Sequence, residues 1–190
     1  GCLCLPRSGS LGLGWARTRE TKGNLMTTSA FGEVRLDRSG RAVRFERHYA
    51  TDLADLWAAC SEPDRLARWF ADVSGELSVG GQAFIAFRDG DHTEITIRRC
   101  DPPHALEVDW AFGEAATSML TVELTSTDDG TRLVLDHRRL PTSSATGYAA
   151  GWHAYLDLLD ACVNDREIGT WQQRFNELID DYWDAPAGRR

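Results

Sequence analysis

The chain has 190 residues, of which 42% are hydrophobic, and it carries a formal net charge of −8. No segment approaches the roughly 20 consecutive apolar residues that span a bilayer. An acidic chain without a basic cluster also suits neither nucleic acid nor an anionic membrane surface. This length fits one domain with a sizeable core. Lys22 is the only lysine, and this preference for arginine suggests a GC-rich bacterial genome.

The first 25 residues differ in composition from the rest of the chain. They contain several Gly and Ser, four basic residues and no hydrophobic periodicity, and they lack the apolar centre of a secretory signal. Met26 stands in a context suited to an initiator, so we expect 1–25 to be a disordered leader or an upstream extension. The alternative is a genuine flexible tail. We expect a single domain over 26–185 and a second flexible tail over 186–190.

The domain is predicted to begin with a strand and two short helices. Alternating apolar residues indicate a strand over 41–49. A helix over 52–60 follows, because Thr51-Asp52 offers an N-cap and the apolar residues after it recur at helical spacing. Pro63 fits the first turn of a second helix over 62–70, which ends in the adjacent aromatics Trp69 and Phe70.

A meander of strands and two C-terminal helices are predicted next. Turn residues separate the expected strands at 77–88, 92–100, 105–112, 117–126 and 131–139. Short turns between successive strands indicate antiparallel pairing. Amphipathic periodicity predicts a helix over 148–164 and a second helical stretch over 171–182. This order of elements is that of an α+β protein in which a curved antiparallel sheet wraps around a long C-terminal helix and encloses a cavity.

Several short motifs, in this order, resemble the START-like (SRPBCC) proteins, most closely the branch of heat-shock-protein ATPase activator homologues. The motifs are Phe45-Glu-Arg-His-Tyr-Ala50, Leu56-Trp57, Glu62-Pro-Asp-Arg-Leu-Ala-Arg-Trp-Phe70, Gly80-Gly81, Asp101-Pro102, Leu106 to Trp110, Gly130-Thr-Arg-Leu133, His137 and Gly151-Trp152. The resemblance covers about 41–163. It departs at Thr51, where many relatives have proline. It implies a helix-grip fold with a hydrophobic cavity, in a superfamily that includes lipid binders, aromatic cyclases and co-chaperone domains.

We expect the ligand cavity to lie between the sheet and the long helix. Pockets are typically lined by apolar and aromatic side chains with a few orienting polar groups. The expected lining is Trp69, Phe70, Ile85, Phe87, Ile97, Arg99, Val108, Trp110, Leu120, Leu135, His137, Trp152, Tyr155, Leu156 and Leu159. For the tryptophans, the alternative is that they only fill the core.

Two polar residues in this set have competing interpretations. His137 shares a predicted face with Leu133 and Leu135, so it is either a structural histidine satisfied by a hydrogen bond or a weak candidate for a general base. Arg99 shares the predicted face of Ile97 and could meet an anionic ligand group. It could equally pair with an acid such as Glu107 at the rim.

The sequence favours a binding protein over an enzyme. It contains no nucleophile elbow, phosphate loop, dinucleotide fingerprint or metal-ligand spacing, so we expect no cofactor and no metal. Widely spaced cysteines among apolar residues suggest reduced thiols in a cytoplasmic protein. The leading hypothesis is binding of a small hydrophobic or amphipathic molecule. The alternatives are a polyketide cyclase or hydrolase that uses the cavity as its active site, and a co-chaperone-like interaction module.

Overall fold

The structure is a computed structural model that describes residues 31–37, 40–111, 117–167 and 169–184. The expected leader at 1–25, the expected tail at 186–190 and Phe112 lie outside these residues. The described strands are β1 Glu33–Asp37, β2 Gly40–Tyr49, β3 Asp72–Gly75, β4 Gln82–Ala86, β5 His92–Asp101, β6 Ala105–Ala111, β7 Ser118–Thr127 and β8 Gly130–Leu140. The described helices are α1 Leu53–Ser61, α2 Pro63–Trp69, α3 Ala145–Val163 and α4 Trp171–Asp184.

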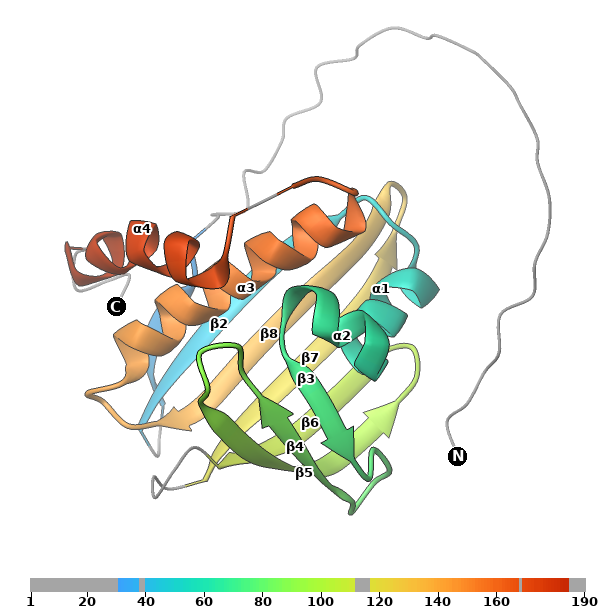
Figure 1. The fold of residues 1–190 in the computed structure, drawn as a ribbon, viewed down its shortest axis with the longest axis horizontal. Coiled ribbons are helices and arrows are strands. Elements are labelled where there is room, and N and C mark those ends of the chain that lie inside the picture. Colours follow the sequence, from blue (N-terminus) through green and yellow to red (C-terminus); the bar gives the residue numbers. More distant parts are fainter. Residues whose placement is uncertain (1–30, 38–39, 112–116, 168, 185–190) are drawn as a thin grey trace, which may run out of the picture.

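All eight strands form one antiparallel sheet in the order β1-β2-β8-β7-β6-β5-β4-β3. The sheet is curved and open, and α3 lies across its concave side (Figure 1). This is the helix-grip architecture that the order of elements predicts. The first strand of the meander, β2, pairs with the last strand, β8, so the sheet curls around the helix and leaves only the short strands β1 and β3 as edges.

Two short helices close one side of the sheet. Asp52 is the N-cap of α1 and accepts a hydrogen bond from the backbone N–H of Asp55 at 2.8 Å, which satisfies one of the free donors at a helix start. Pro63 occupies the first turn of α2, where its missing N–H costs no hydrogen bond. Trp69 and Phe70 are both buried at the end of α2, with ring centres 5.4 Å apart.

Helix α3 is buried along much of its length. Small residues such as Ala149, Ala150 and Ala154 are fully inaccessible, which lets the helix approach the sheet closely. Trp152, Leu156 and Leu159 then fill the space between helix and sheet. Helix α4 packs against α3 and does not lie on the sheet (Figure 1).

Two predicted boundaries differ clearly from the structure. The strand expected over 77–88 is confined to β4, because Gly80 adopts a φ of 87° in a turn that precedes it. Helix α3 begins at Ala145, three residues before the expected start at 148. The sequence also did not predict β1 and β3.

In the described parts of the chain, no helix has the length and apolar character needed to cross a membrane.

Candidate functional site

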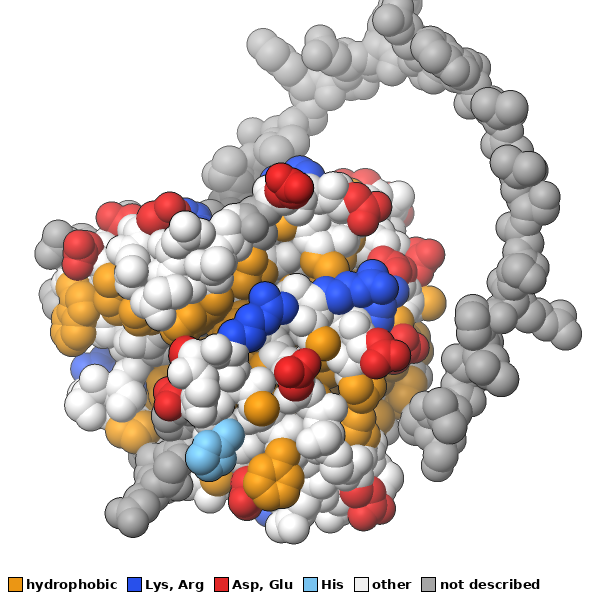
Figure 2. Space-filling model, viewed as in Figure 1, with side chains coloured by type: hydrophobic (Ala, Val, Ile, Leu, Met, Phe, Trp, Pro, Cys, Tyr) orange, Lys and Arg blue, Asp and Glu red, His pale blue; other side chains and the backbone are white. Residues whose placement is uncertain are grey.

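A cavity of about 450 Å³ lies between the sheet, α3 and α4. Aromatic rings from five different parts of the chain line it. They are Phe70, Phe87, Trp110, Tyr148, Trp152, Tyr155, Trp171, Phe175 and Trp183. In the space-filling view, hydrophobic side chains gather below α4 and beside the β4–β5 hairpin (Figure 2). The aromatic wall therefore continues towards the surface at this end of the molecule, where the Trp183 side chain is 56% exposed.

Phe70 is the centre of the inner wall. Its ring stacks on Trp152 at an interplanar angle of 11° and a centroid distance of 5.8 Å. It also meets the ring edges of Tyr155 at 4.8 Å and Phe87 at 5.6 Å. Such contacts add to the stabilisation that burial gives, by about 0.5–1.5 kcal/mol per pair. The end of α2, the β4–β5 hairpin and α3 are held together by this one side chain.

The outer wall comes from α4. Trp171 stacks on Tyr155 of α3 at 5.4 Å and on Phe175 at 4.9 Å. The indole N–H of Trp171 donates to the backbone carbonyl of Gly151 at 3.2 Å. A Cβ at Gly151 would lie 3.6 Å from the Trp171 ring, an ordinary van der Waals contact, so the helices pack closely here but leave room for a methyl group.

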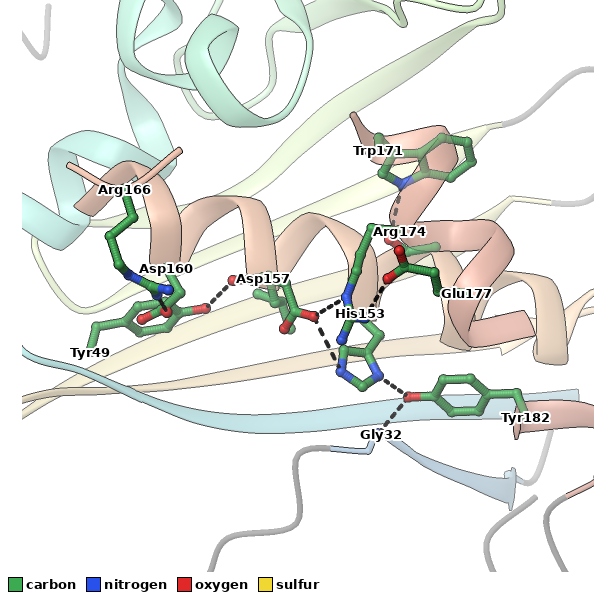
Figure 3. A network of polar contacts seen from close by, with 12 residues as sticks. Gly32, Tyr49, His153, Asp157, Asp160, Arg166, Trp171, Arg174, Glu177 and Tyr182 are labelled. Atoms are coloured by element: carbon green, nitrogen blue, oxygen red, sulfur yellow. Dashed lines mark hydrogen bonds and ion pairs between the residues drawn. The ribbon is translucent and has the colours of Figure 1, made fainter. Parts of the chain in front are cut away.

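A second set of contacts fixes α4 to α3 and to the segment that precedes β1 (Figure 3). The Tyr182 hydroxyl accepts from the backbone N–H of Gly32 at 2.8 Å and lies 3.0 Å from Nδ1 of His153. Asp157, one turn along α3, forms an ion pair with Arg174 of α4 at 2.7 Å. Burial lowers the pKa of His153 to about 4, although the nearby Asp157 carboxylate opposes this shift. His153 is therefore neutral near pH 7.

His137 lies directly behind the cavity wall, with no exposed surface. The indole N–H of Trp152 donates to its Nδ1 at 3.0 Å, and its Nε2 lies 2.8 Å from the Ser118 hydroxyl. Because Nδ1 accepts, the proton of the neutral ring is on Nε2 and is donated to Ser118. Ser118 in turn donates to the backbone carbonyl of Trp110 at 3.2 Å. Each polar atom of the imidazole thus has a partner.

This arrangement determines what His137 can do chemically. Desolvation by burial lowers its pKa to about 3, although the Asp136 carboxylate opposes the shift, so the ring is neutral near pH 7. A general base must accept a proton at the nitrogen that faces the reacting group. The nitrogen that faces Ser118 already carries one, so His137 does not activate Ser118 as a nucleophile in this geometry.

Polar groups are few in the cavity. Ser118 lies at its inner end, and the Tyr148 ring packs edge-on against His137 at 4.9 Å. Among the lining residues that the structure describes, only Asp89 and Asp91 of the β4–β5 hairpin are charged, and both are exposed. No three His, Cys, Asp or Glu side chains of the described residues lie close enough together to hold a metal ion. The site is a largely aromatic container with an acidic rim.

Residues 50–164 match the family model described as "Activator of Hsp90 ATPase homolog 1-like protein". The chain belongs to this family. It is thus a member of the SRPBCC superfamily, as the motifs indicated, and its domain is of the cavity-containing kind. Comparison of the sequence with curated proteins finds no match.

Solved structures with the same fold include three at 25% identity. CalU16 from Micromonospora echinospora matches with a TM-score of 0.66 over 80% of this chain and 93% of its own. The protein encoded by gene BPP1335 from Bordetella parapertussis matches with a TM-score of 0.63 over 86% and 97%. DynU16, a protein in the dynemicin biosynthetic locus, matches with a TM-score of 0.62 over 65% of this chain and 47% of its own.

The structure separates the residues expected to line a cavity into three groups. Phe70, Phe87, Trp110, Trp152 and Tyr155 line the cavity described above, and His137 lies behind its wall. The second group is buried in the core away from the cavity lining. It consists of Trp69, Ile85, Ile97, Val108, Leu120, Leu135, Leu156 and Leu159. The third group is Arg99 alone.

The placement of Arg99 on the inner face is wrong. Its side chain is 56% exposed and forms an ion pair with Asp101 at 2.9 Å. A register shift between Ile97 and Arg99 interrupts the alternation of β5, so both Arg98 and Arg99 face solvent. Glu107 is its neighbour across the strand pair, but the ion pair forms with Asp101.

The sequence analysis did not assign the contribution of α4 to the cavity. The apolar stripe predicted for this helix was Trp171, Phe175, Leu178 and Tyr182. Trp171 and Phe175 line the cavity, whereas Leu178 and Tyr182 are buried in the core. The cavity stripe continues at a spacing of four residues with Ile179 and Trp183. A helix with two adjacent apolar stripes is typical of one that covers a surface on two sides. That spacing is the signal by which the outer wall could have been found.

Proposed function

We propose that this family member binds a small hydrophobic or amphipathic molecule in the aromatic cavity. The observation that carries the proposal is the volume of about 450 Å³ together with the nearly continuous aromatic lining. Ligand pockets typically measure about 300–1,000 Å³ and combine apolar walls with a few polar groups. DynU16, a structural neighbour from a biosynthetic locus, supports a small organic molecule as the occupant.

The geometry of His137 favours binding over catalysis as the role of the cavity. A cyclase or hydrolase that used this residue as a base would need an unprotonated nitrogen facing the substrate. Both nitrogens are instead occupied, by Trp152 and Ser118, and the low pKa makes the ring a weak base. These contacts serve to hold α3 against the sheet and to shape the cavity wall.

Gly147 allows a direct test of the cavity. It lies in the first turn of α3 and lines the cavity, and a Cβ built there meets no atom within 4 Å. Gly147→Leu therefore adds a side chain to open space, and Gly147→Ala is the matched control that adds only a methyl group. Glycine destabilises a helix relative to alanine by roughly 0.5–1 kcal/mol, so replacing it should not lower the stability of the protein.

The experiment titrates the full chain and both variants with N-phenyl-1-naphthylamine, a neutral fluorescent probe of apolar cavities. We expect saturable binding to the wild type and to Gly147→Ala, and at least about tenfold weaker binding to Gly147→Leu at an unchanged or higher melting temperature. Equal binding by the two variants, or no saturable binding at all, would contradict the proposal. Native mass spectrometry of freshly purified protein, followed by denaturing extraction, then identifies any co-purified molecule.

A further inference from the structure

The aromatic wall of the cavity contains one buried donor that is not satisfied by the described residues. Trp110 is 4% exposed, and its indole Nε1 has no hydrogen-bond partner. An unpaired buried N–H carries a desolvation cost, so such a group in a native structure calls for a physical explanation. The other tryptophans at the core of this site do have acceptors, since Trp152 donates to His137 and Trp171 to Gly151.

The Tyr148 hydroxyl lies beside this donor. The Trp110 and Tyr148 rings both pack edge-on against His137, with centroids 5.7 and 4.9 Å from it. Burial raises the pKa of the Tyr148 phenol, and interaction with the Trp110 indole N–H partly offsets the rise. No acceptor among the described residues lies in good hydrogen-bond geometry to this N–H, so it stays available to a better-placed oxygen. Both residues line the cavity. A phenol keeps its own proton available to an acceptor. Two donors, one from the sheet and one from α3, thus lie next to each other in a wall that is otherwise mostly aromatic carbon.

We infer that Trp110 Nε1 and the Tyr148 hydroxyl form a subsite for an oxygen acceptor of the ligand, such as the carbonyl oxygen of an aryl ketone. The inference rests on the proposed binding function and specifies the chemical class of its ligand. A carbonyl oxygen has two lone pairs and can accept from both donors at once. A hydrocarbon in the same position leaves both donors unpaired, so the subsite discriminates in favour of oxygenated aromatic molecules.

Ser118 and the two aspartates do not compete for this role. The Ser118 hydroxyl lies close by in the wall, but its proton is donated to the backbone carbonyl of Trp110. Asp89 and Asp91 offer acceptors and no donors. The Tyr155 hydroxyl is the other phenol among the described lining residues, and its ring stacks on Trp171 of the outer wall. Tyr155 therefore supplies a matched control in another part of the wall.

The test compares two probes that differ only in the acceptor, 2-acetylnaphthalene and 2-ethylnaphthalene, by their quenching of tryptophan fluorescence. The quantity of interest is the ratio of their dissociation constants in the wild type, in Tyr148→Phe and in Tyr155→Phe. Removal of one ligand hydrogen bond should lower the preference for the ketone about five- to tenfold in Tyr148→Phe. The Tyr155→Phe variant should keep the ratio of the wild type. The Trp110 indole N–H resonance in a ¹H–¹⁵N spectrum should move downfield with the ketone and not with the hydrocarbon.

Each outcome bears on the inference in a defined way. An unchanged ratio in Tyr148→Phe, or a larger loss in Tyr155→Phe, overturns the subsite while leaving cavity binding intact. Failure of both probes to bind any of the proteins contradicts the proposed function itself, and the subsite with it. The Tyr148→Phe variant should fold normally, because it keeps the aromatic ring that contacts His137 and the position is only half-buried.

Discussion

The Trp152 indole N–H donates to Nδ1 of His137 across 3.0 Å, and this one hydrogen bond assigns the proton of the imidazole to the opposite nitrogen. It joins α3 to β8 through side chains that are 6% and 0% exposed. The tautomer of His137 is thus fixed by a residue that cannot accept a proton in return, since the indole nitrogen is a donor only. The neighbouring serine and histidine, a pairing that is catalytic in other proteins, therefore have a structural role here.

The buried histidine makes stability depend on pH. The pKa of His137 is about 3 in the folded protein and 6.5 in its ordinary range, so the unfolded chain takes up a proton first as the pH falls. The stabilisation is complete above about pH 6.5 and is lost progressively towards pH 3. His137→Gln should reduce the slope of unfolding free energy against pH, measured by urea denaturation between pH 6 and 4, by up to about 1.4 kcal/mol per pH unit.

His104→Gln is the matched control for this measurement, because it removes an exposed imidazole from the turn before β6. The control reports the effect of losing a histidine without burial. His153, whose pKa is about 4, contributes in the same direction and remains in both variants. An equal pH slope in wild type and His137→Gln would show that His137 takes up its proton over the same pH range in the folded and the unfolded protein, and would contradict a ring kept neutral by burial.

The attachment of α4 is expected to depend on Tyr182. Tyr182→Phe keeps the buried ring but removes the hydroxyl that meets Gly32 and His153, which leaves two buried polar atoms unpaired. The free energy of unfolding should fall by about 1–3 kcal/mol. Glu177→Gln is the control on the same helix. The Glu177 side chain is 63% exposed, so its ion pair with Arg174 should contribute less than about 1 kcal/mol to the free energy of unfolding. A Tyr182→Phe protein as stable as the control would show that this contact is not needed to hold α4.

The acidic rim predicts a charge preference for ligands. Asp89 and Asp91 are the only charged groups among the described lining residues, so an anionic probe such as 8-anilinonaphthalene-1-sulfonate should bind more weakly than the neutral N-phenyl-1-naphthylamine. Replacing both aspartates with asparagine should narrow the difference in affinity between the two probes. The effect should be clearest at low ionic strength, because exposed charges are screened by salt. The same double change at Asp128 and Asp129, in the turn between β7 and β8, alters the net charge equally and should leave this difference in affinity unchanged.

The interior of this fold could be predicted from the sequence much better than its edges. Strands such as β2 and β7 are buried mainly on one face and therefore show alternation, and the N-cap of α1 at Asp52 was recognisable from its chemistry. The missed strands β1 and β3 are the two edges of the sheet. Each of these strands is short and has little buried surface. It is a strand because it pairs with its neighbour in the sheet, and its own sequence shows no clear alternation of apolar and polar residues.

The site was predictable only in part, for two physical reasons. Alternation places a residue on a face but does not say whether that face meets a cavity or a packed side chain, and so Phe87 and Ile85 were indistinguishable. A bulge is also invisible to alternation, which is why Arg99 was assigned to the wrong side of β5. Tyr148 and Ser118 were not assigned to the cavity because their roles depend on pairing between elements distant in sequence.

The outer wall of the cavity has one consequence for how new specificities can arise. The family match ends at residue 164, whereas Trp171, Phe175, Ile179 and Trp183 all lie beyond it on α4. The helix that completes the cavity is therefore a separate stretch of sequence from the part that the family model matches. Exchanging α4 between family members, with Tyr182 and Arg174 kept as anchors, would graft a different recognition surface onto the same sheet and long helix. Such chimeras offer a direct route to engineering binders for new small molecules on this scaffold.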